Sequence, residues 1–138
     1  MKTIITLLCL IYGSLLTAQT AKLTVEVTNI KTLEGKMRVA LFNGESSYLK
    51  DADYEADTVI YDSGAVLITF KDLPLGEYAI SLYHDQNDNG KLDANFMGIP
   101  SEPYAFSNNA PSRFGPAKYE EARFTLINDE NKQQIKLN

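Results

Sequence analysis

The sequence has one cysteine, one histidine and no tryptophan in its 138 residues. These counts exclude a disulfide framework and leave too few ligands for a Cys/His zinc site. Basic residues are also few, since 13 lysines and arginines stand against 18 aspartates and glutamates, for a formal net charge of −5. That balance argues against nucleic acid as a partner, because binding a run of phosphates needs a basic surface. The 44% of hydrophobic residues is otherwise typical of a folded domain.

The chain also lacks an apolar run long enough to span a bilayer as a helix. The longest such run, residues 4–16, follows Lys2 and precedes Ala18. A basic start, a short apolar segment and a small residue at the cleavage position are typical of a secretory signal peptide. We therefore expect a signal peptide over residues 1–18, and a mature chain with no transmembrane segment that is exported to the periplasm or the outer surface. Its length predicts a single domain over residues 19–138.

Apolar and polar residues alternate along most of the remaining chain, which indicates strands with one buried face. Only residues 46–56 tolerate a helical interpretation, and no strand–helix alternation of a parallel α/β sheet is present. We expect an all-β, antiparallel, immunoglobulin-like sandwich of about seven strands, with a small closed barrel as the second choice. The alternating sets are Leu23/Val25/Val27, Met37/Val39/Leu41, Val66/Ile68/Phe70, Tyr78/Ile80/Leu82, Phe124/Leu126 and Ile135/Leu137.

One long segment, residues 85–118, shows no sustained period and is rich in Asn, Gly and Pro. Loops longer than about 12–15 residues are usually functional or disordered. Its aromatic residues predict an ordered loop that is anchored against the sandwich. The expected anchors are Phe96, Tyr104, Phe106, Phe114 and Tyr119.

The first part of this loop, DQNDNGKLD, predicts a calcium site. Oxygen-bearing side chains alternate before Gly90, whose permitted positive φ would let the loop turn around an ion. Phe96 stands where a bidentate Glu closes an EF-hand loop, so the affinity expected is weak, on the order of 10⁻⁴–10⁻³ M. The alternative is that the same residues form Asx turns without an ion. The expected ligands are Asp85, Asn87, Asn89, the Lys91 carbonyl, Asp93 and, from just beyond the loop, Glu102.

Two segments resemble known families. Residues 70–80, FKDLPLGEYAI, are similar to the Leu-Pro-x-Gly-x-Tyr turn of prealbumin-like sandwich modules, which include carboxypeptidase regulatory-like domains and surface-adhesin B-type repeats. The adhesin repeats also carry calcium loops that residues 85–93 resemble. Residues 78–110 resemble the exported bacterial family catalogued as domain of unknown function 2141, in which Gly often stands at the position of Ala105. This resemblance implies a small periplasmic or outer-surface β-sandwich with unassigned activity and no established catalytic residues.

His84 is the only histidine, so any catalytic base of the Ser–His type depends on it. The nearby hydroxyls of Ser81, Ser101 and Ser107 do not lie in a nucleophile elbow. We therefore expect the His84 side chain to form a hydrogen bond with loop backbone at the end of its strand. The alternative is that the protein is a small secreted hydrolase that uses His84.

The function expected from these observations is that of a non-enzymatic envelope or surface module with a calcium-braced loop. Tyr104 and Phe106 are placed where the loop could present a surface to a ligand or partner, either an envelope protein or a glycan. A purely structural part of a larger envelope assembly is a further possibility.

Overall fold

The computed structural model describes residues 18–62 and 64–138. The predicted signal peptide therefore lies outside the described residues, apart from Ala18. Within the described ranges, no helix has both the length and the apolar character that a membrane crossing requires.

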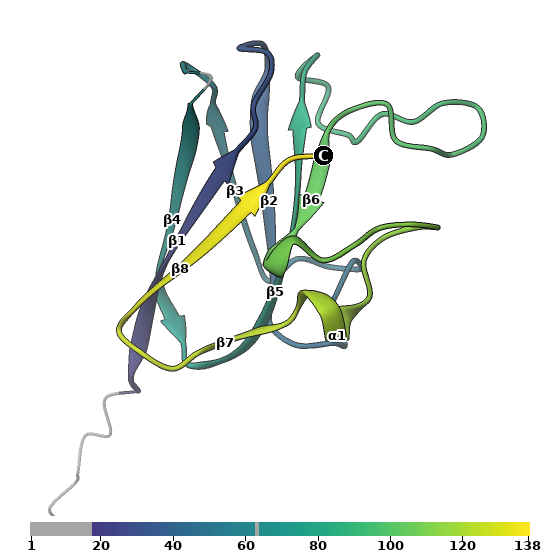
Figure 1. The fold of residues 1–138 in the computed structure, drawn as a ribbon. Coiled ribbons are helices and arrows are strands. Elements are labelled where there is room, and N and C mark those ends of the chain that lie inside the picture. Colours follow the sequence, from purple (N-terminus) through teal and green to yellow (C-terminus); the bar gives the residue numbers. More distant parts are fainter. Residues whose placement is uncertain (1–17, 63) are drawn as a thin grey trace, which may run out of the picture.

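Two sheets pack face to face (Figure 1). Three strands form the first sheet in the order β4-β1-β8, and β3-β2-β5-β6 form the second, with β7 paired to the start of β5. This arrangement confirms the predicted all-β sandwich. The element bounds are β1 Thr20–Thr28, β2 Lys36–Phe42, β3 Tyr54–Val59, β4 Ala65–Pro74, β5 Gly76–Asp85, β6 Tyr104–Phe106, the 3₁₀ turn η1 Ser107–Asn109, α1 Tyr119–Ala122, β7 Phe124–Leu126 and β8 Glu130–Lys136.

One pairing departs from the expected antiparallel pattern, because β8 runs parallel to β1. The chain leaves β7 at the end of the sandwich where β1 begins, and the N–H of Lys22 donates to the carbonyl of Asp129 at 2.7 Å. From that point β8 can only run in the same direction as β1. The first sheet is therefore mixed, whereas the second is antiparallel throughout.

The period-two pattern places the main core between the sheets. In β1 the apolar positions alternate strictly with partly exposed ones. Residues 46–50 form turns instead of the helix that the sequence tolerates, and the unexpected strand β3 follows at Tyr54. Strand β3 escaped prediction because its only large apolar side chains are at its ends. The centre of the core comprises Leu23, Val25, Val27, Met37, Leu41, Leu73, Tyr78, Ile80, Leu82, Leu126, Ile135 and Leu137.

The turn between β4 and β5 explains the Leu-Pro-x-Gly-x-Tyr pattern. Gly76 adopts a φ of +148°, in a region that residues with a Cβ rarely enter. The ring of Tyr78 is fully buried, and its hydroxyl donates to the carbonyl of Pro74 at 2.8 Å. The buried Tyr therefore closes the turn from inside the sandwich.

A second apolar cluster lies on the outer face of the β3-β2-β5-β6 sheet. It joins Phe42 and Phe106 of the sheet to Tyr48 and Tyr119 of the covering segments. The Tyr48 hydroxyl donates to the carbonyl of Ala117 at 2.8 Å, which ties the two covering segments together. The second half of the long loop is thus ordered against the sandwich, as expected.

Two of the expected aromatic anchors are instead exposed. Phe96 and Phe114 have relative exposures of 98% and 105%, so neither ring packs on the sandwich. Both lie in loop segments that project beyond the sheets (Figure 1). The burial is supplied by Phe106, Tyr119 and, in part, Tyr104.

The turn before β2 packs directly on the end of β5 through Gly35. Its φ is +69°, and a Cβ at this position would lie 1.9 Å from the carbonyl oxygen of Asp85. Only glycine therefore permits the backbone contact that fixes where the long loop begins.

We expect Gly35→Ala to lower the free energy of unfolding by at least about 2 kcal/mol, because it adds both backbone strain and a collision with backbone. Chemical denaturation measures the change. Gly44→Ala is the matched control, since Gly44 also has a positive φ (+97°) but no heavy atom lies within 4 Å of the position that a Cβ would take there. Equal losses in the two variants would contradict a specific contact at Gly35.

Candidate functional site

The side chain of Arg38 connects three aspartates on the outer face of the second sheet. Its Nε donates to Asp85 Oδ2 at 2.5 Å and its Nη2 donates to Asp88 Oδ1 at 2.8 Å. Its Nη1 lies 3.5 Å from Asp57 Oδ2 on the neighbouring strand β3. The guanidinium therefore joins β2, β3, the end of β5 and the loop that follows. The hydrogen bond to Asp85 raises the pKa of Arg38 above its ordinary, already high value.

Asp85 is the fully buried member of this group. Its Oδ2 also accepts the N–H of Gly90 at 2.8 Å, and its Oδ1 accepts the N–H of Asn89 at 3.0 Å. Burial acts to raise the pKa of Asp85, but Arg38 and these two N–H groups outweigh it, and the pKa is lowered. The carboxylate is thus held ionised at the first turn of the loop.

Glu102 closes the same loop from its other end. Its Oε1 accepts the N–H of Gln86 at 2.9 Å, and its Oε2 accepts the N–H of Asp93 at 3.0 Å. Glu102 is buried, so these hydrogen bonds form in a partly dry environment where they count for more. One carboxylate therefore clamps both ends of residues 86–93.

The predicted calcium ligands gather in this loop, and most of their oxygens accept hydrogen bonds from the protein. Asn87 and Asn89 donate their side-chain N–H groups to Asp93 at 2.6 to 3.0 Å. The side-chain oxygens of both asparagines accept backbone N–H groups in Asx turns, which were the alternative expectation; the N–H of Lys91 is one of the donors. In residues 18–62 and 64–138, no three His, Cys, Asp or Glu side chains are grouped so that they could hold a metal ion.

Arg38 supplies a positive charge beside Asp85, the first of the predicted calcium ligands. Sequence reasoning missed it because Arg38 precedes Asp85 by 47 positions and is brought beside it only by strand pairing. The available signal was its place among the polar positions of the β2 alternation. Calcium binding stays a prediction.

His84 points into the sandwich, on the inner face of β5. It is 1% exposed, and its Nε2 lies 2.6 Å from the carbonyl oxygen of Glu34. The bond to backbone at the strand end matches the expected role, and the backbone that it reaches belongs to the turn before β2. A base at this position is enclosed by the core that includes Met37, its partner across the sheet.

The two residues expected on a ligand surface differ in position. Phe106 is buried in the second apolar cluster, because its side chain packs beneath the covering segments. Tyr104 is half-buried, and its hydroxyl accepts a hydrogen bond from Ser112 at 3.0 Å. The expected surface is therefore corrected for Phe106, which stabilises the fold from within.

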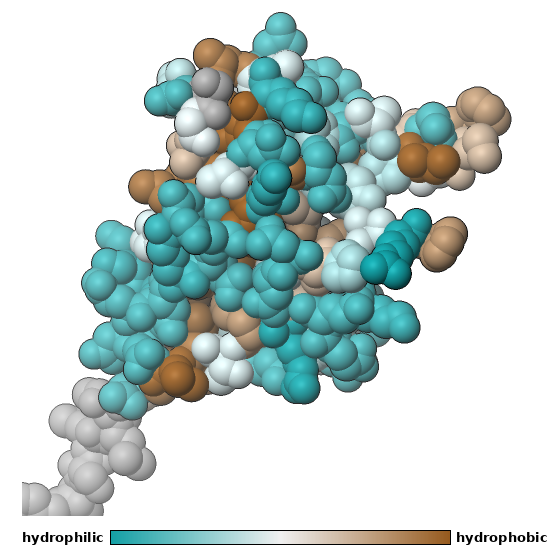
Figure 2. All heavy atoms as spheres, in the orientation of Figure 1, coloured by the Kyte–Doolittle hydropathy of each residue, from teal (hydrophilic) through white to brown (hydrophobic). Residues whose placement is uncertain are grey.

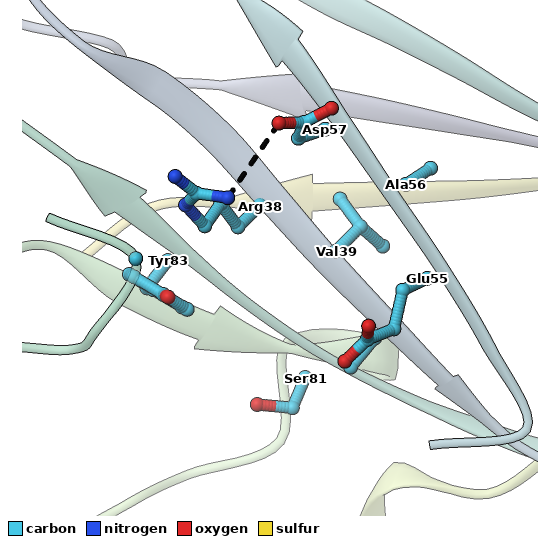
Figure 3. A pocket seen from close by; sticks show the side chains of 9 residues that line it. Arg38, Val39, Glu55, Ala56, Asp57, Ser81 and Tyr83 are labelled. Atoms are coloured by element: carbon cyan, nitrogen blue, oxygen red, sulfur yellow. Dashed lines mark ion pairs between the residues drawn. The ribbon is translucent and has the colours of Figure 1, made fainter. Parts of the chain in front are cut away.

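A hollow of about 380 Å³ lies on the outer face of the second sheet, next to Arg38 (Figure 3). The hollow is lined by two rows of residues that strand pairing places side by side. In one row Ala40 lies between Glu55 and Ser81, and in the other Arg38 lies between Asp57 and Tyr83. The small side chains of Ala40 and Ser81 leave the centre open, and the larger polar groups stand around it. The backbone of Gly90 brings the start of the long loop to the edge of the hollow.

The fold and this site define a small all-β sandwich domain with a polar hollow on one sheet face and a hydrogen-bonded loop beside it. Residues 25–135 match the model of a family described as an uncharacterized protein conserved in bacteria (DUF2141), and the chain belongs to that family. The match confirms the resemblance seen in residues 78–110, and the prealbumin-like arrangement is compatible with the observed strands. No curated protein and no solved structure matches the chain.

We expect Asp85→Asn to lower the free energy of unfolding by about 2–3 kcal/mol at pH 7, because the neutral amide leaves Arg38 without its buried counter-charge. The pKa of Asp85 is lowered in the folded chain from an ordinary value of about 3.9. The stabilisation is therefore fully present above about pH 4 and is lost as the pH falls through the folded pKa. Denaturation curves at several pH values measure this loss.

The difference between Asp85→Asn and the unsubstituted protein should consequently shrink toward low pH. Asp51→Asn, at an exposed position, is the matched control and should leave the pH profile of stability unchanged. A constant difference between pH 7 and pH 2 would contradict a role for the ionised Asp85.

Proposed function

We propose that this protein is an exported, non-enzymatic envelope or surface module that binds a glycan unit in the hollow beside Arg38. The observation that carries the proposal is the composition of that hollow: a small floor at Ala40 and Ser81 with charged and aromatic walls. Its volume of about 380 Å³ is within the range of small-molecule sites, which begins near 300 Å³. The export signal predicted in residues 1–18 supports the location.

The chemistry of the walls suits a neutral, polyhydroxylated ring. Glu55 and Asp57 accept hydrogen bonds from hydroxyl groups, and Arg38 donates them. Burial raises the pKa of Tyr83 by more than Arg38 lowers it, so its hydroxyl stays protonated and both donates and accepts. Two carboxylates, Glu55 and Asp57, line the hollow against the single cation Arg38, so an anionic ligand would be repelled and a neutral one is favoured.

The hollow is also held in shape before any ligand arrives. Arg38 is paired with Asp57, Asp85 and Asp88, so its guanidinium has little freedom to lose on binding. Preorganisation of this kind lowers the entropic cost of association. The ion pairs of Arg38 with Asp85 and Asp88, which order the loop, therefore also fix one wall of the hollow.

The position of His84 supports a binding module over a hydrolase. His84 lies on the inner face of β5, whereas the hollow lies on the outer face of the same sheet. Its ring is enclosed and bonded to the Glu34 carbonyl. A general base must come within hydrogen-bond reach of the substrate, and this ring faces away from the hollow.

We expect Ser81→Phe to abolish binding, because the added ring fills the centre of the hollow. Isothermal titration against a panel of neutral oligosaccharides measures the affinity of the unsubstituted protein and of the variant. Thr69→Phe is the matched control, since it adds the same ring to an exposed position of the opposite sheet. Unchanged affinity in Ser81→Phe, or no binding to any member of the panel, would contradict the proposal.

Calcium enters this proposal as a weak additional brace of residues 85–93. Of the predicted ligands, Asp85 is the one that pairs with Arg38. The oxygen atoms left for an ion are those of Asn87, Asn89, the Lys91 carbonyl, Asp93 and Glu102. An ion held there would reinforce the loop that borders the hollow, in addition to the brace that Arg38 already provides.

At a calcium concentration of about twenty times Kd, linkage predicts a gain of about 1.8 kcal/mol in the free energy of unfolding. For a domain of this size the melting temperature should rise by about 5–10 °C relative to the same protein in chelator. Magnesium is the matched control, because it demands a stricter octahedral geometry than this loop offers. Identical melting curves in calcium and chelator would remove calcium from the proposal.

A further inference from the structure

The segment that follows the predicted calcium loop ends in an apolar tip whose backbone is hydrogen-bonded internally. Residues 93–101 form a small hairpin in which the N–H of Asn95 donates to the carbonyl of Ile99 at 2.9 Å and the N–H of Ser101 donates to that of Asp93 at 2.8 Å. The Asn95 side chain accepts the N–H groups of Met97 and Ile99. With its polar backbone bonded internally, the hairpin turns apolar side chains outward. Phe96, Met97 and Ile99 are all exposed.

A second loop carries a similar tip. Residues 110–118 connect η1 to α1 and are held at their base by the buried side chain of Ala117. Phe114 at this tip is completely exposed, and Arg113 beside it is exposed as well. Both loops project on the same side of the sandwich (Figure 1), and apolar surface is visible at the end of the upper one (Figure 2).

Charge separates these tips from the rest of the molecule. Residues 94–101 and 110–118 contain no Asp or Glu, although the chain has 18 of them. Arg113 and Lys118 are the charged residues of the two segments. The tips are thus apolar and weakly basic on a protein whose formal net charge is −5.

We propose that these two tips insert into a phospholipid surface and hold the sandwich against it. Apolar side chains on projecting points fit a fluid, deformable medium, in which they lie about 5–10 Å deep at the boundary of headgroups and acyl chains. Arg113 is placed to meet the lipid phosphates, while the acidic body is repelled by the same surface and stays above it. A second copy of this chain offers no match, because the hollow on its sheet has charged walls at Arg38, Glu55 and Asp57.

The absence of tryptophan from the sequence makes each tip testable separately. In Phe96→Trp and Phe114→Trp chains, the fluorescence of the single Trp should shift to shorter wavelength on vesicles of phosphatidylethanolamine and phosphatidylglycerol, and brominated lipids should quench it. Tyr61→Trp is the matched control, because Tyr61 is 84% exposed and belongs to the connection between β3 and β4, which is part of neither tip. Its emission should not change.

The role of the basic residue is measured in the Phe114→Trp chain. Arg113→Ser should raise the lipid concentration that gives half the spectral shift by about fivefold on the phosphatidylglycerol vesicles. Lys71→Ser, which removes an exposed charge from β4 on the other sheet, should leave that concentration unchanged.

Three results would overturn the proposal. One is unshifted emission from both tip variants in the presence of vesicles. Another is an equal shift in Tyr61→Trp, which would show that vesicles bind the chain elsewhere, for example through residues 1–18. The last is a shift that grows with protein concentration in vesicle-free buffer, since that would identify the tips as contacts between protein copies.

Discussion

The pairing of Arg38 with Asp85 holds together the strand end, the loop and the hollow. Asp85 is the last residue of β5 and is fully buried, so its charge needs a partner. Arg38 provides it at 2.5 Å, and the N–H groups of Asn89 and Gly90 complete the set of donors. A single buried carboxylate therefore fixes the end of the strand, the first turn of the loop and the orientation of the guanidinium.

The same pair links the loop to the hollow. Arg38 forms part of the wall of the hollow, and Gly90 of the loop reaches its edge. A change in the position of the loop would therefore move the Arg38 side chain, and with it the wall of the hollow. Gly35 and Glu102 support the pair from two sides, because Gly35 packs on the Asp85 backbone and Glu102 holds residues 86 and 93.

The features proposed to be functional lie on two parts of the molecule with different physical character. The hollow is lined by polar groups, of which Arg38 and Asp57 form an ion pair, and such a lining suits a ligand recognised through hydrogen bonds. The loop tips carry apolar groups that the fold leaves uncovered, and the backbone of the tip in residues 93–101 is hydrogen-bonded internally. Contiguous exposed apolar side chains, such as Phe96, Met97 and Ile99, are a common mark of interaction surfaces.

Most of the strands could be predicted from local patterns, since alternation in sets such as Leu23/Val25/Val27 needs only neighbouring residues. The oxygen-rich loop from Asp85 to Asp93 could be located in the same way. These patterns could not show strand β3, whose residues are alternately half-buried and exposed and include few large apolar side chains, or the parallel pairing of β8 with β1. The packing of the chain was needed to show that Arg38 is the cation beside Asp85, that Phe106 is buried and that Phe96 and Phe114 are exposed. The reason is that charge pairing and burial depend on which distant segments meet in space, whereas periodicity is a local property of the chain.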